Sequence, residues 1–363
     1  MKNTFGTSVA VTLFGESHGS EIGGVLDGLA PGVPVCEDHI RECLAQRRPH
    51  GTISTARQEQ DPFRIISGVK DGLTTGAPIA ILIPNGDTKS GDYDQMQHLA
   101  RPGHADFAAS QKYHGYEIRE GGGHFSGRLT APLVALGAIA QDALAQKGIL
   151  IGTHISTLGC VGDRGFECLQ EDVALLHSKL FPVLDDEAGE RMQAQILKVK
   201  EEGDSLGGVL ECAVIGVPAG VGEPWFDTVE GVLAHALFSI PGVKGVEFGD
   251  GFALTDMKGS EANDPLRQVD GRVVTTTNHN GGINGGITNG MPLIIRLAVK
   301  PTPTIAKEQG TVDLATGENA TLAAKGRHDP CIVHRVRAVV DAMVALTLCD
   351  LLSGRFGTDY FTP

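Results

Sequence analysis

Four glycine-rich segments of the chain each combine glycine with histidine, arginine or aspartate. They cover residues 15–19, 101–106, 121–128 and 325–330. Glycine lets the backbone approach a ligand closely, arginine matches carboxylate and phosphate groups, and histidine can transfer a proton near neutral pH. With 49 glycines among 363 residues and no collagen-like period, the chain has to fold around many ordered loops. The recurrence of these segments predicts an enzyme site built around an anion.

Length, composition and charge exclude several classes of protein. The chain is 41% hydrophobic and 20% charged, which is typical of a globular protein with a sizeable core. Its formal net charge of -14 argues against a nucleic-acid or membrane-surface partner, because such surfaces require basic patches. The N-terminus lacks the apolar stretch of a signal peptide, and apolar residues never run long enough to span a membrane. We therefore expect a cytoplasmic protein that concentrates its cations locally.

The cysteines suggest neither a disulfide framework nor a zinc site. The chain has 7 of them, an odd number, and none forms a Cys-x-x-Cys pair. We expect buried, reduced thiols and no bound metal.

Short β-like runs and amphipathic helices are mixed along the chain. Runs rich in Val, Ile and Leu predict strands at residues 63–69, 78–83, 209–217, 246–254 and 292–299. Helical periodicity predicts helices at residues 37–46, 130–147, 187–201, 226–238 and 330–352. The strands do not alternate strictly with helices, and no Rossmann or P-loop glycine motif follows a strand. The pattern favours an α+β fold with antiparallel sheets.

The last predicted helix has the clearest boundaries. Asp329 followed by Pro330 fits an N-cap and a first helical position, and Gly354 would follow the end of the helix.

No Pro/Ser-rich linker divides the chain. Residues 162–203 are more polar and less regular than their flanks. We expect a single large domain over residues 1–363 with a peripheral excursion at about residues 162–203.

Further motifs occur in a fixed order between the glycine-rich segments. They comprise residues 47–49, 67–69, 74–79, 91–93, 242–252, 278–287 and 300–304. Each motif is weak alone, but their conjunction in order is specific. With these motifs the chain resembles the chorismate synthase family over almost its whole length.

The resemblance implies a reaction and an architecture. The reaction is the anti-1,4-elimination of phosphate from 5-enolpyruvylshikimate 3-phosphate, which gives chorismate and requires reduced FMN (FMNH2) without net oxidation. The implied fold is a pair of packed antiparallel β-sheets with flanking helices, a β-α-β sandwich with the helices outside. The resemblance also implies a homotetramer and a monofunctional enzyme that receives reduced flavin from a separate reductase.

Three catalytic positions follow from the resemblance. His18 corresponds to the proton donor for the leaving phosphate, His104 to the group that stabilises the reduced flavin near N1 and O2, and Asp329 to the group beside flavin N5. A lone histidine is more often an ordinary surface or hydrogen-bonded residue. Only the neighbouring Gly and Arg residues favour a catalytic role for His18 and His104. Asp329 has a second interpretation as a helix N-cap, and both roles can hold at once.

The resemblance also assigns binding residues. Those for the substrate are Ser17, Arg48, Arg101, Arg128 and Arg327. Those for the flavin are Ser126, Pro241, Gly242, Gly285, Lys300, Pro301, Thr302, Pro303, Thr304 and again Arg327. Lys300 is equally consistent with an ordinary lysine at the end of a strand. Arg101 and Arg128 have a second interpretation as solvated surface charges, but their glycine neighbours favour anion binding. Ser17 and Ser126 have a second interpretation as turn residues. For His279 and His328 we expect structural roles.

The chain departs from the family pattern at two places. The glycine-rich loop carries His124, Phe125, Gly127 and Leu129 where most members have Arg, Ser, Ala and Glu. The segment after Arg48 lacks a second arginine, and Arg57, His50 or His124 are candidates to replace that charge. Two other functions stay open from the residues alone. One is a flavin- or phosphate-ester-binding protein that has lost the reaction, and the other is a metal-dependent hydrolase, although no metal-ligand spacing supports it.

Overall fold

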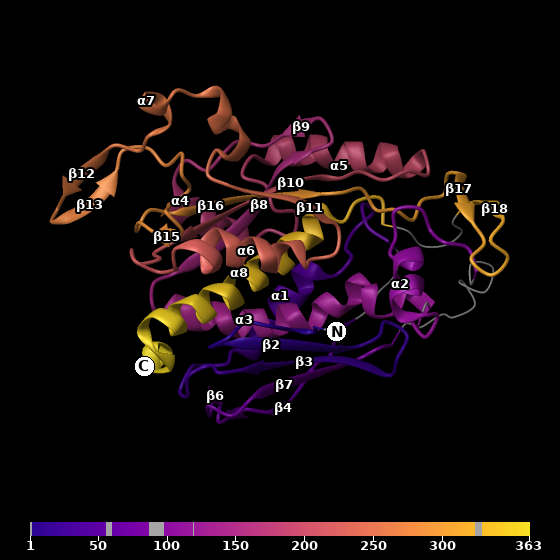
Figure 1. Ribbon diagram of the computed structural model, residues 1–363, viewed down its shortest axis with the longest axis horizontal. Helices are drawn as coiled ribbons and strands as arrows, with labels where there is room; N and C mark the ends of the chain where they lie inside the picture. The colour runs from indigo at the N-terminus through magenta and orange to yellow at the C-terminus, as the bar shows by residue number, and fades with distance from the viewer. Residues whose placement is uncertain (1, 56–59, 87–97, 119, 324–328) are drawn as a thin grey trace.

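Two antiparallel sheets form the frame of the molecule. The computed structural model describes residues 2–55, 60–86, 98–118, 120–323 and 329–363. The first five-stranded sheet has the order β1 (Thr4–Phe5), β2 (Ala10–Gly15), β3 (Glu21–Asp27), β7 (Ile79–Pro84), β4 (Arg64–Ser67). The second five-stranded sheet has the order β11 (Val243–Phe248), β16 (Leu293–Val299), β10 (Gly208–Ile215), β8 (Leu150–Leu158), β9 (Val161–Gly162). Figure 1 shows the first sheet at the bottom and the second at the top.

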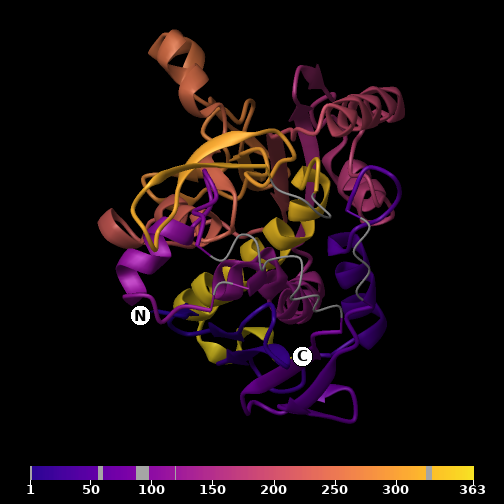
Figure 2. The same cartoon turned by 90° about the vertical axis from the view of Figure 1, so that its right-hand side faces the viewer.

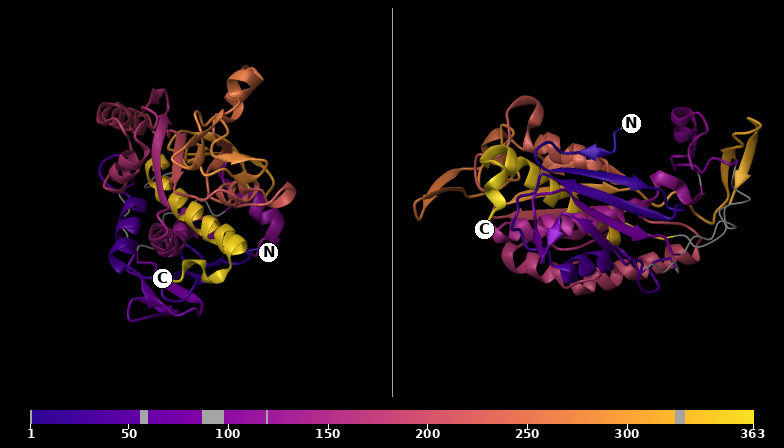
Figure 3. Two further views of the ribbon diagram at one scale, coloured as in Figure 1. Left: turned by 90° about the vertical axis from the view of Figure 1, so that its left-hand side faces the viewer. Right: turned by 90° about the horizontal axis from the view of Figure 1, so that it is seen from below.

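Helices fill the space between the two sheets. Helix α3 (Thr130–Gln146) packs on β3 and β7 of the first sheet, and α8 (Val333–Phe356) packs on β8 and β10 of the second. The two helices also pack on each other, and Figure 3 shows α8 in yellow running through the middle of the molecule. Beside them lie α1 (Glu37–Arg47), against both helices, and α6 (Val229–Phe238), against α8.

The predicted fold class is confirmed, but the place of the helices is corrected. The α+β class and the β-α-β sandwich with antiparallel sheets are present. The expectation that the helices lie outside is wrong for α3 and α8, which separate the sheets. The physical reason is that α3 is buried without interruption from Thr130 to Ala140 and α8 along most of its length. A helix that is apolar on all sides is stable only when both faces are covered.

The remaining elements lie at the periphery. Four two-stranded ribbons are formed by β5 (Val69–Lys70) with β6 (Leu73–Thr74), β12 (Leu266–Val269) with β13 (Arg272–Thr275), β14 (Ile283–Asn284) with β15 (Ile287–Thr288), and β17 (Gln309–Val312) with β18 (Asn319–Leu322). The peripheral helices are α2 (Asp106–Tyr113), α4 (Leu169–His177), α5 (Asp186–Glu201) and α7 (Gly259–Ala262). Helices α4 and α5 come from the polar segment 162–203 and lie against β8 and β9 of the second sheet.

Two predicted elements have boundaries that differ from the prediction. The strand expected at residues 246–254 ends at Phe248, and a 3-10 helix occupies Gly251–Asp256. Helix α8 begins at Val333, so Asp329 is not its N-cap, and the helix runs through Gly354 to Phe356. The start is delayed because the Pro330 carbonyl accepts a hydrogen bond from Leu206 N at 2.8 Å, which holds this segment beside residue 206.

All seven cysteines are free, and four of them are buried as expected. Cys36, Cys160 and Cys168 are exposed, which corrects the expectation for these three. No helix in the described part of the chain is long and apolar enough to cross a bilayer.

The two central helices cross at a glycine. A Cβ atom added at Gly137 of α3 would lie 2.2 Å from Ala342 Cβ of α8, so the helices approach as closely as their backbones allow. At Gly354 of α8, an added Cβ would find its nearest atom, Ser8 Oγ, at an ordinary 3.8 Å.

We predict opposite effects of alanine at these two helical glycines. Gly137→Ala forces α3 and α8 apart and is expected to lower the free energy of unfolding by about 1–3 kcal/mol. Gly354→Ala, the matched control, removes backbone freedom from the unfolded chain and is expected to raise it by about 0.5 kcal/mol. Urea denaturation of both variants measures the difference. Equal effects of the two substitutions would show that the crossing is not tight.

Candidate active site

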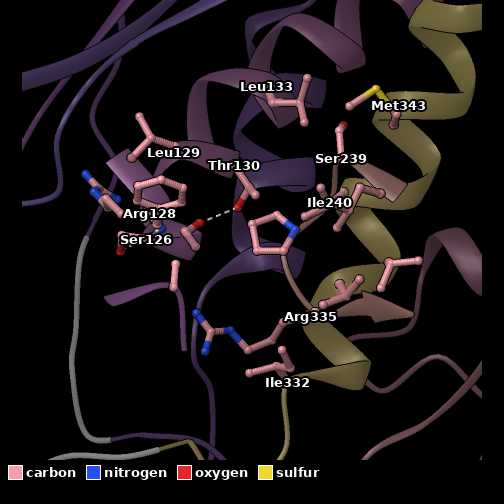
Figure 4. A pocket seen from close by; sticks show the side chains of 18 of the residues that line it. Ser126, Arg128, Leu129, Thr130, Leu133, Ser239, Ile240, Ile332, Arg335 and Met343 are labelled. Atoms are coloured by element: carbon pink, nitrogen blue, oxygen red, sulfur yellow. Dashed lines mark hydrogen bonds between the residues drawn. The ribbon is translucent and has the colours of Figure 1, made fainter. Parts of the chain in front are cut away.

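A cavity of about 960 Å³ lies where the N-terminal strand, the central helices and several loops meet. Its apolar wall comes from the first sheet and from α3, α6 and α8, including Leu13, Leu133, Phe238 and Met343. In Figure 4, Ser126 and Arg128 lie on one side of the cavity, Ile240 on the other, and Arg335 reaches in from the start of α8. One end of the cavity is therefore apolar and the other cationic.

The cavity gathers most of the predicted site residues. Those that line it are Arg48, His104, Ser126, Arg128, Pro241, Gly242, Lys300, Pro301, Thr302, Pro303, Thr304 and Asp329. Among the described residues, Ser17, His18, Arg101 and Gly285 are not in the lining. Arg327, with Arg57, His328 and the whole motif at 91–93, lies outside the described residues.

His104 is held at the cavity wall by charged neighbours. Its Nδ1 lies 2.7 Å from Asp106 Oδ1, and Arg101 donates from Nε and Nη2 to the same carboxylate at 2.7 and 2.8 Å. Burial acts to raise the pKa of Asp106, but the hydrogen bonds from Arg101 and His104 outweigh it and hold that pKa well below its usual range. The permanent carboxylate fixes the proton of His104 on Nδ1, so Nε2 is the nitrogen left to act at the cavity. Arg101 thus orients His104 and does not itself line the cavity.

Other parts of the same chain hold residues 98–104 in place. Ala100 N donates to Val312 O at 3.2 Å, and Leu314 N donates to His98 O at 2.8 Å. These contacts place residues 98–100 beside the β17–β18 ribbon at one end of the molecule (Figures 1 and 2). Lys300 Nζ donates to the Gly103 carbonyl, which ties the segment 300–304 to the same loop.

His18 lies where two glycine-rich segments meet. Ser17 N donates to Gly123 O at 3.1 Å, and Ser17 Oγ lies 3.1 Å from His18 Nδ1. A Cβ atom at Gly121 would lie 2.0 Å from His18 Cε1, and Gly121 has a left-handed φ of 61°. Only glycine at this position leaves room for the imidazole. The two segments therefore lie against each other, and His18 stands beside the cavity lining and not in it.

Arg128 is engaged inside the protein. Its Nη1 donates to Asp61 Oδ1, its Nε to Asn85 Oδ1 at 3.0 Å and its Nη2 to Pro84 O at 3.1 Å. Arg47 Nη1 lies 3.5 Å from the other oxygen of Asp61, whose side chain is fully buried. Asp61 therefore joins two arginines of the cavity lining, and no local pattern indicated it, because one of its partners is far along the chain.

Asp329 contacts the chain on both sides of the cavity. Oδ1 accepts a hydrogen bond from Thr55 N at 3.0 Å, and Oδ2 accepts one from Arg335 Nη1 at 2.6 Å. Arg335 Nε in turn donates to the Arg47 carbonyl at 2.9 Å. Arg335 was not predicted, although its position in the first turn of α8, six residues after Asp329, was a signal once the helix start is placed correctly.

The two histidines proposed to replace a missing arginine differ in position. His124 lines the cavity, and its Nδ1 lies 2.8 Å from the Gly15 carbonyl, so Nε2 is the nitrogen left for a ligand. His50 lies 3.2 Å from the Arg48 carbonyl through Nδ1 and packs its ring on buried His334. His50 Nε2 is buried without a hydrogen-bond partner among the described residues. The geometry favours His124.

Two predicted flavin residues lie apart from each other. Gly242 lines the cavity at the start of β11 with a left-handed φ of 94°. Gly285 forms the turn of the β14–β15 ribbon, with a φ of 60°.

The fold, the His–Asp–Arg cluster and the cationic cavity together are typical of an enzyme that acts on an anionic small molecule. The chorismate synthase family model matches residues 9–352. The chorismate synthase of Thermococcus gammatolerans is 46% identical over 96% of this chain and 97% of its own. That of Korarchaeum cryptofilum is 45% identical over 95% of this chain and 96% of its own. A crystal structure of chorismate synthase superimposes with a TM-score of 0.77 at 30% identity, covering 97% of this chain and 94% of that one. The chain belongs to the chorismate synthase family and is an enzyme of the lyase class.

Proposed function

We propose that the protein eliminates phosphate from 5-enolpyruvylshikimate 3-phosphate to form chorismate, the last step of the shikimate pathway towards aromatic amino acids. Family membership over nearly the whole chain supports this function. The structural observation that carries it is the single cavity lined by His104, Ser126, the segment 300–304 and Asp329. These residues are spread over the chain, and a shared ligand is the simplest reason for their convergence.

The cavity suits reduced FMN as the cofactor. Its apolar end can cover a flat ring system, while Lys300 and the buried hydroxyl of Thr302, which has no hydrogen-bond partner among the described residues, supply polar groups at the other end. We expect Ser126, Pro241, Gly242 and the segment 300–304 to hold the flavin. When bound, reduced FMN supplies transient electron density to the reacting ring.

The protein's own groups have distinct tasks in this proposal. His104, with its Nδ1 proton fixed by Asp106, holds a proton or a hydrogen bond through Nε2 at the flavin. Asp329, oriented by Arg335 and Thr55, receives or relays the proton removed from the substrate ring.

The leaving phosphate requires a proton and positive charge. We assign the proton to His18, next to Ser17, and the charge to Arg48 with Arg335 and Arg327. Arg128 and Arg101 act indirectly on the phosphate, because the guanidinium group of Arg128 is hydrogen-bonded to Asp61 and that of Arg101 to Asp106.

The alternatives have lost their support. A binding protein without the reaction is not favoured, because relatives at 43–46% identity over nearly the whole chain are chorismate synthases. A metal-dependent hydrolase is not favoured either, because the chain belongs to the chorismate synthase family.

We also propose a cytoplasmic homotetramer with a separate flavin reductase as its partner. The alignments with relatives cover 351 residues, or 96% of this chain and 97% of the relative, and leave no room for a long insertion that would reduce flavin. The enzyme is accordingly monofunctional.

An oxygen-free assay with three flavin conditions tests this function. Turnover is expected with chemically reduced FMN, and none with oxidised FMN or with oxidised FMN plus NADPH. Turnover with NADPH alone as reductant would contradict a monofunctional enzyme, and turnover without any flavin would contradict the cofactor.

The missing family arginine leads to a further prediction. His124→Ala is expected to raise KM for the phosphorylated substrate by about tenfold, because one hydrogen bond to a charged group is lost. His50→Ala, the matched control, is expected to leave KM unchanged. Steady-state kinetics with the phosphorylated substrate measure KM for both variants. If KM is unchanged in both variants, neither histidine replaces the arginine.

A further inference from the structure

Outside the cavity, a cysteine, a histidine and an aspartate form a chain of contacts between α1 and α3. Cys43 Sγ lies 3.3 Å from His39 Nε2, and His39 Nδ1 lies 2.7 Å from Asp142 Oδ1. The same order of groups, a thiol, an imidazole and an orienting carboxylate, activates nucleophilic cysteines in other proteins. No residue of this cluster lines the cavity described above.

The charge on His39 favours an activated sulfur. The hydrogen bond to Asp142 and then the one to Cys43 raise the pKa of His39 to about 10, against the opposing effect of burial. At neutral pH both ring nitrogens are therefore protonated, and Nε2 donates to the sulfur of Cys43. The second oxygen of Asp142 is buried without a hydrogen-bond partner among the described residues, which further favours a positive imidazole beside it.

The cluster lies close to the surface. Cys43 is 6% exposed, while the side chains of His39, which contacts its sulfur, and of Asp142 are 30% and 21% exposed. The sulfur is therefore nearly buried beside a ring that solvent reaches. A reactant of the size of hydrogen peroxide fits this position better than a protein or a large cofactor does.

We propose that Cys43 is a redox-modification site, at which small hydroperoxides oxidise the thiolate, formed when the thiol loses its proton to solvent, to a sulfenic acid with His39 as the proton donor. The sulfur attacks the outer peroxide oxygen, and the S–O bond forms as the O–O bond breaks. Sulfur loses two electrons, and the peroxide is reduced to an alcohol or water that takes its proton from His39 Nε2. Two equivalents of a small thiol reverse the modification: the first condenses with the sulfenic acid to a mixed disulfide and water, and the second releases the Cys43 thiol as the small disulfide forms.

The position of Cys43 links this chemistry to the cavity. Cys43 lies one helical turn before Arg47, and Arg48 follows directly. Arg47 Nε donates to Thr130 Oγ1 of α3 at 2.8 Å, and Arg48 lines the cavity. An oxygen atom added at Cys43 has to enter the packed contact between α1 and α3. Oxidation is therefore expected to displace the end of α1 and to lower turnover, a consequence that rests on the proposed function.

Site-resolved labelling tests the reactive thiol without any need for activity. The folded protein is treated with iodoacetamide at about pH 6 and pH 8, or with hydrogen peroxide and a cyclic 1,3-diketone that traps sulfenic acids, and each cysteine is quantified by mass spectrometry. At the lower pH, Cys43 is expected to react about tenfold faster than Cys160, an exposed cysteine outside the cluster. Asp142→Asn should lower labelling of Cys43 about tenfold and leave Cys36, at the start of the same helix, unchanged.

Two results would overturn the site. One is labelling of Cys43 no faster than of Cys160 at the lower pH, and the other is labelling of Cys43 that Asp142→Asn leaves unchanged. If the variant does not fold, as judged by circular dichroism, the wild-type comparison of Cys43 with Cys160 decides alone.

Activity after peroxide treatment tests the consequence. The wild type is expected to lose turnover and to recover it with dithiothreitol, while Cys43→Ser keeps its turnover under the same treatment. Equal losses in both proteins would show that oxidation of Cys43 does not lower turnover. The labelling experiment tests the reactivity of the thiol independently of this result.

Discussion

Replacing His104 with alanine is expected to lower kcat by about 10²–10⁴-fold, the usual contribution of a positioned acid–base group. The reason is geometric, because Asp106 and Arg101 fix the Nδ1 side of the ring and direct the other nitrogen to the cavity. Steady-state turnover under reducing, oxygen-free conditions measures the loss. Asp106→Asn should show a smaller loss, because the ring stays but its tautomer is no longer fixed.

A second histidine–aspartate pair provides the control. His39 also lies 2.7 Å from a carboxylate, that of Asp142, but it stands outside the cavity. His39→Gln is expected to keep wild-type kcat. A His104→Ala enzyme that retains more than about a tenth of wild-type turnover would remove His104 from the acid–base role.

Replacing Asp61 with asparagine is expected to lower the free energy of unfolding by about 3–5 kcal/mol, because two buried guanidinium groups lose a negative charge that both contact. Asp61 has a fully buried side chain between Arg47 and Arg128, and its φ of 49° is a conformation that asparagine also accepts. The substitution therefore changes the charge with little effect on the backbone. Urea denaturation measures the loss.

The exposed pair of Asp38 with Arg41 is the control for this experiment. The two side chains are 2.7 Å apart but are 84% and 57% exposed. Asp38→Asn is expected to cost less than about 0.5 kcal/mol, because solvent screens the pair. If Asp61→Asn costs no more than the control, the paired arginines do not depend on Asp61.

Strands were predicted where Val, Ile and Leu are concentrated. Those at 78–83, 209–217 and 292–299 correspond to β7, β10 and β16. Strand β3 was missed because it contains Gly23 and Gly24, residues that argue against a strand. The structure explains the second glycine, since a Cβ at Gly24 would lie 2.8 Å from Leu136 Cδ1 of α3. A local pattern cannot report a contact with a helix more than a hundred residues away.

The residues of the candidate site were also predicted only in part. Glycine with His, Arg or Asp predicted the segments that meet near His104 and His18, because such loops carry their chemistry in a few adjacent residues. Arg335 and Asp61 were missed because their roles depend on the start of α8 and on two distant arginines. The sequence also does not show that Arg101 and Arg128 bond to carboxylates within the protein.

The most direct test of the central claim is the stoichiometry of products in an oxygen-free reaction of the wild-type protein with 5-enolpyruvylshikimate 3-phosphate and reduced FMN. The account predicts one chorismate for each phosphate released, over many turnovers, with the flavin still reduced at the end. Phosphate release without chorismate would mean hydrolysis and not elimination. Flavin oxidised in proportion to product would mean a net redox reaction, and either result would contradict the assignment.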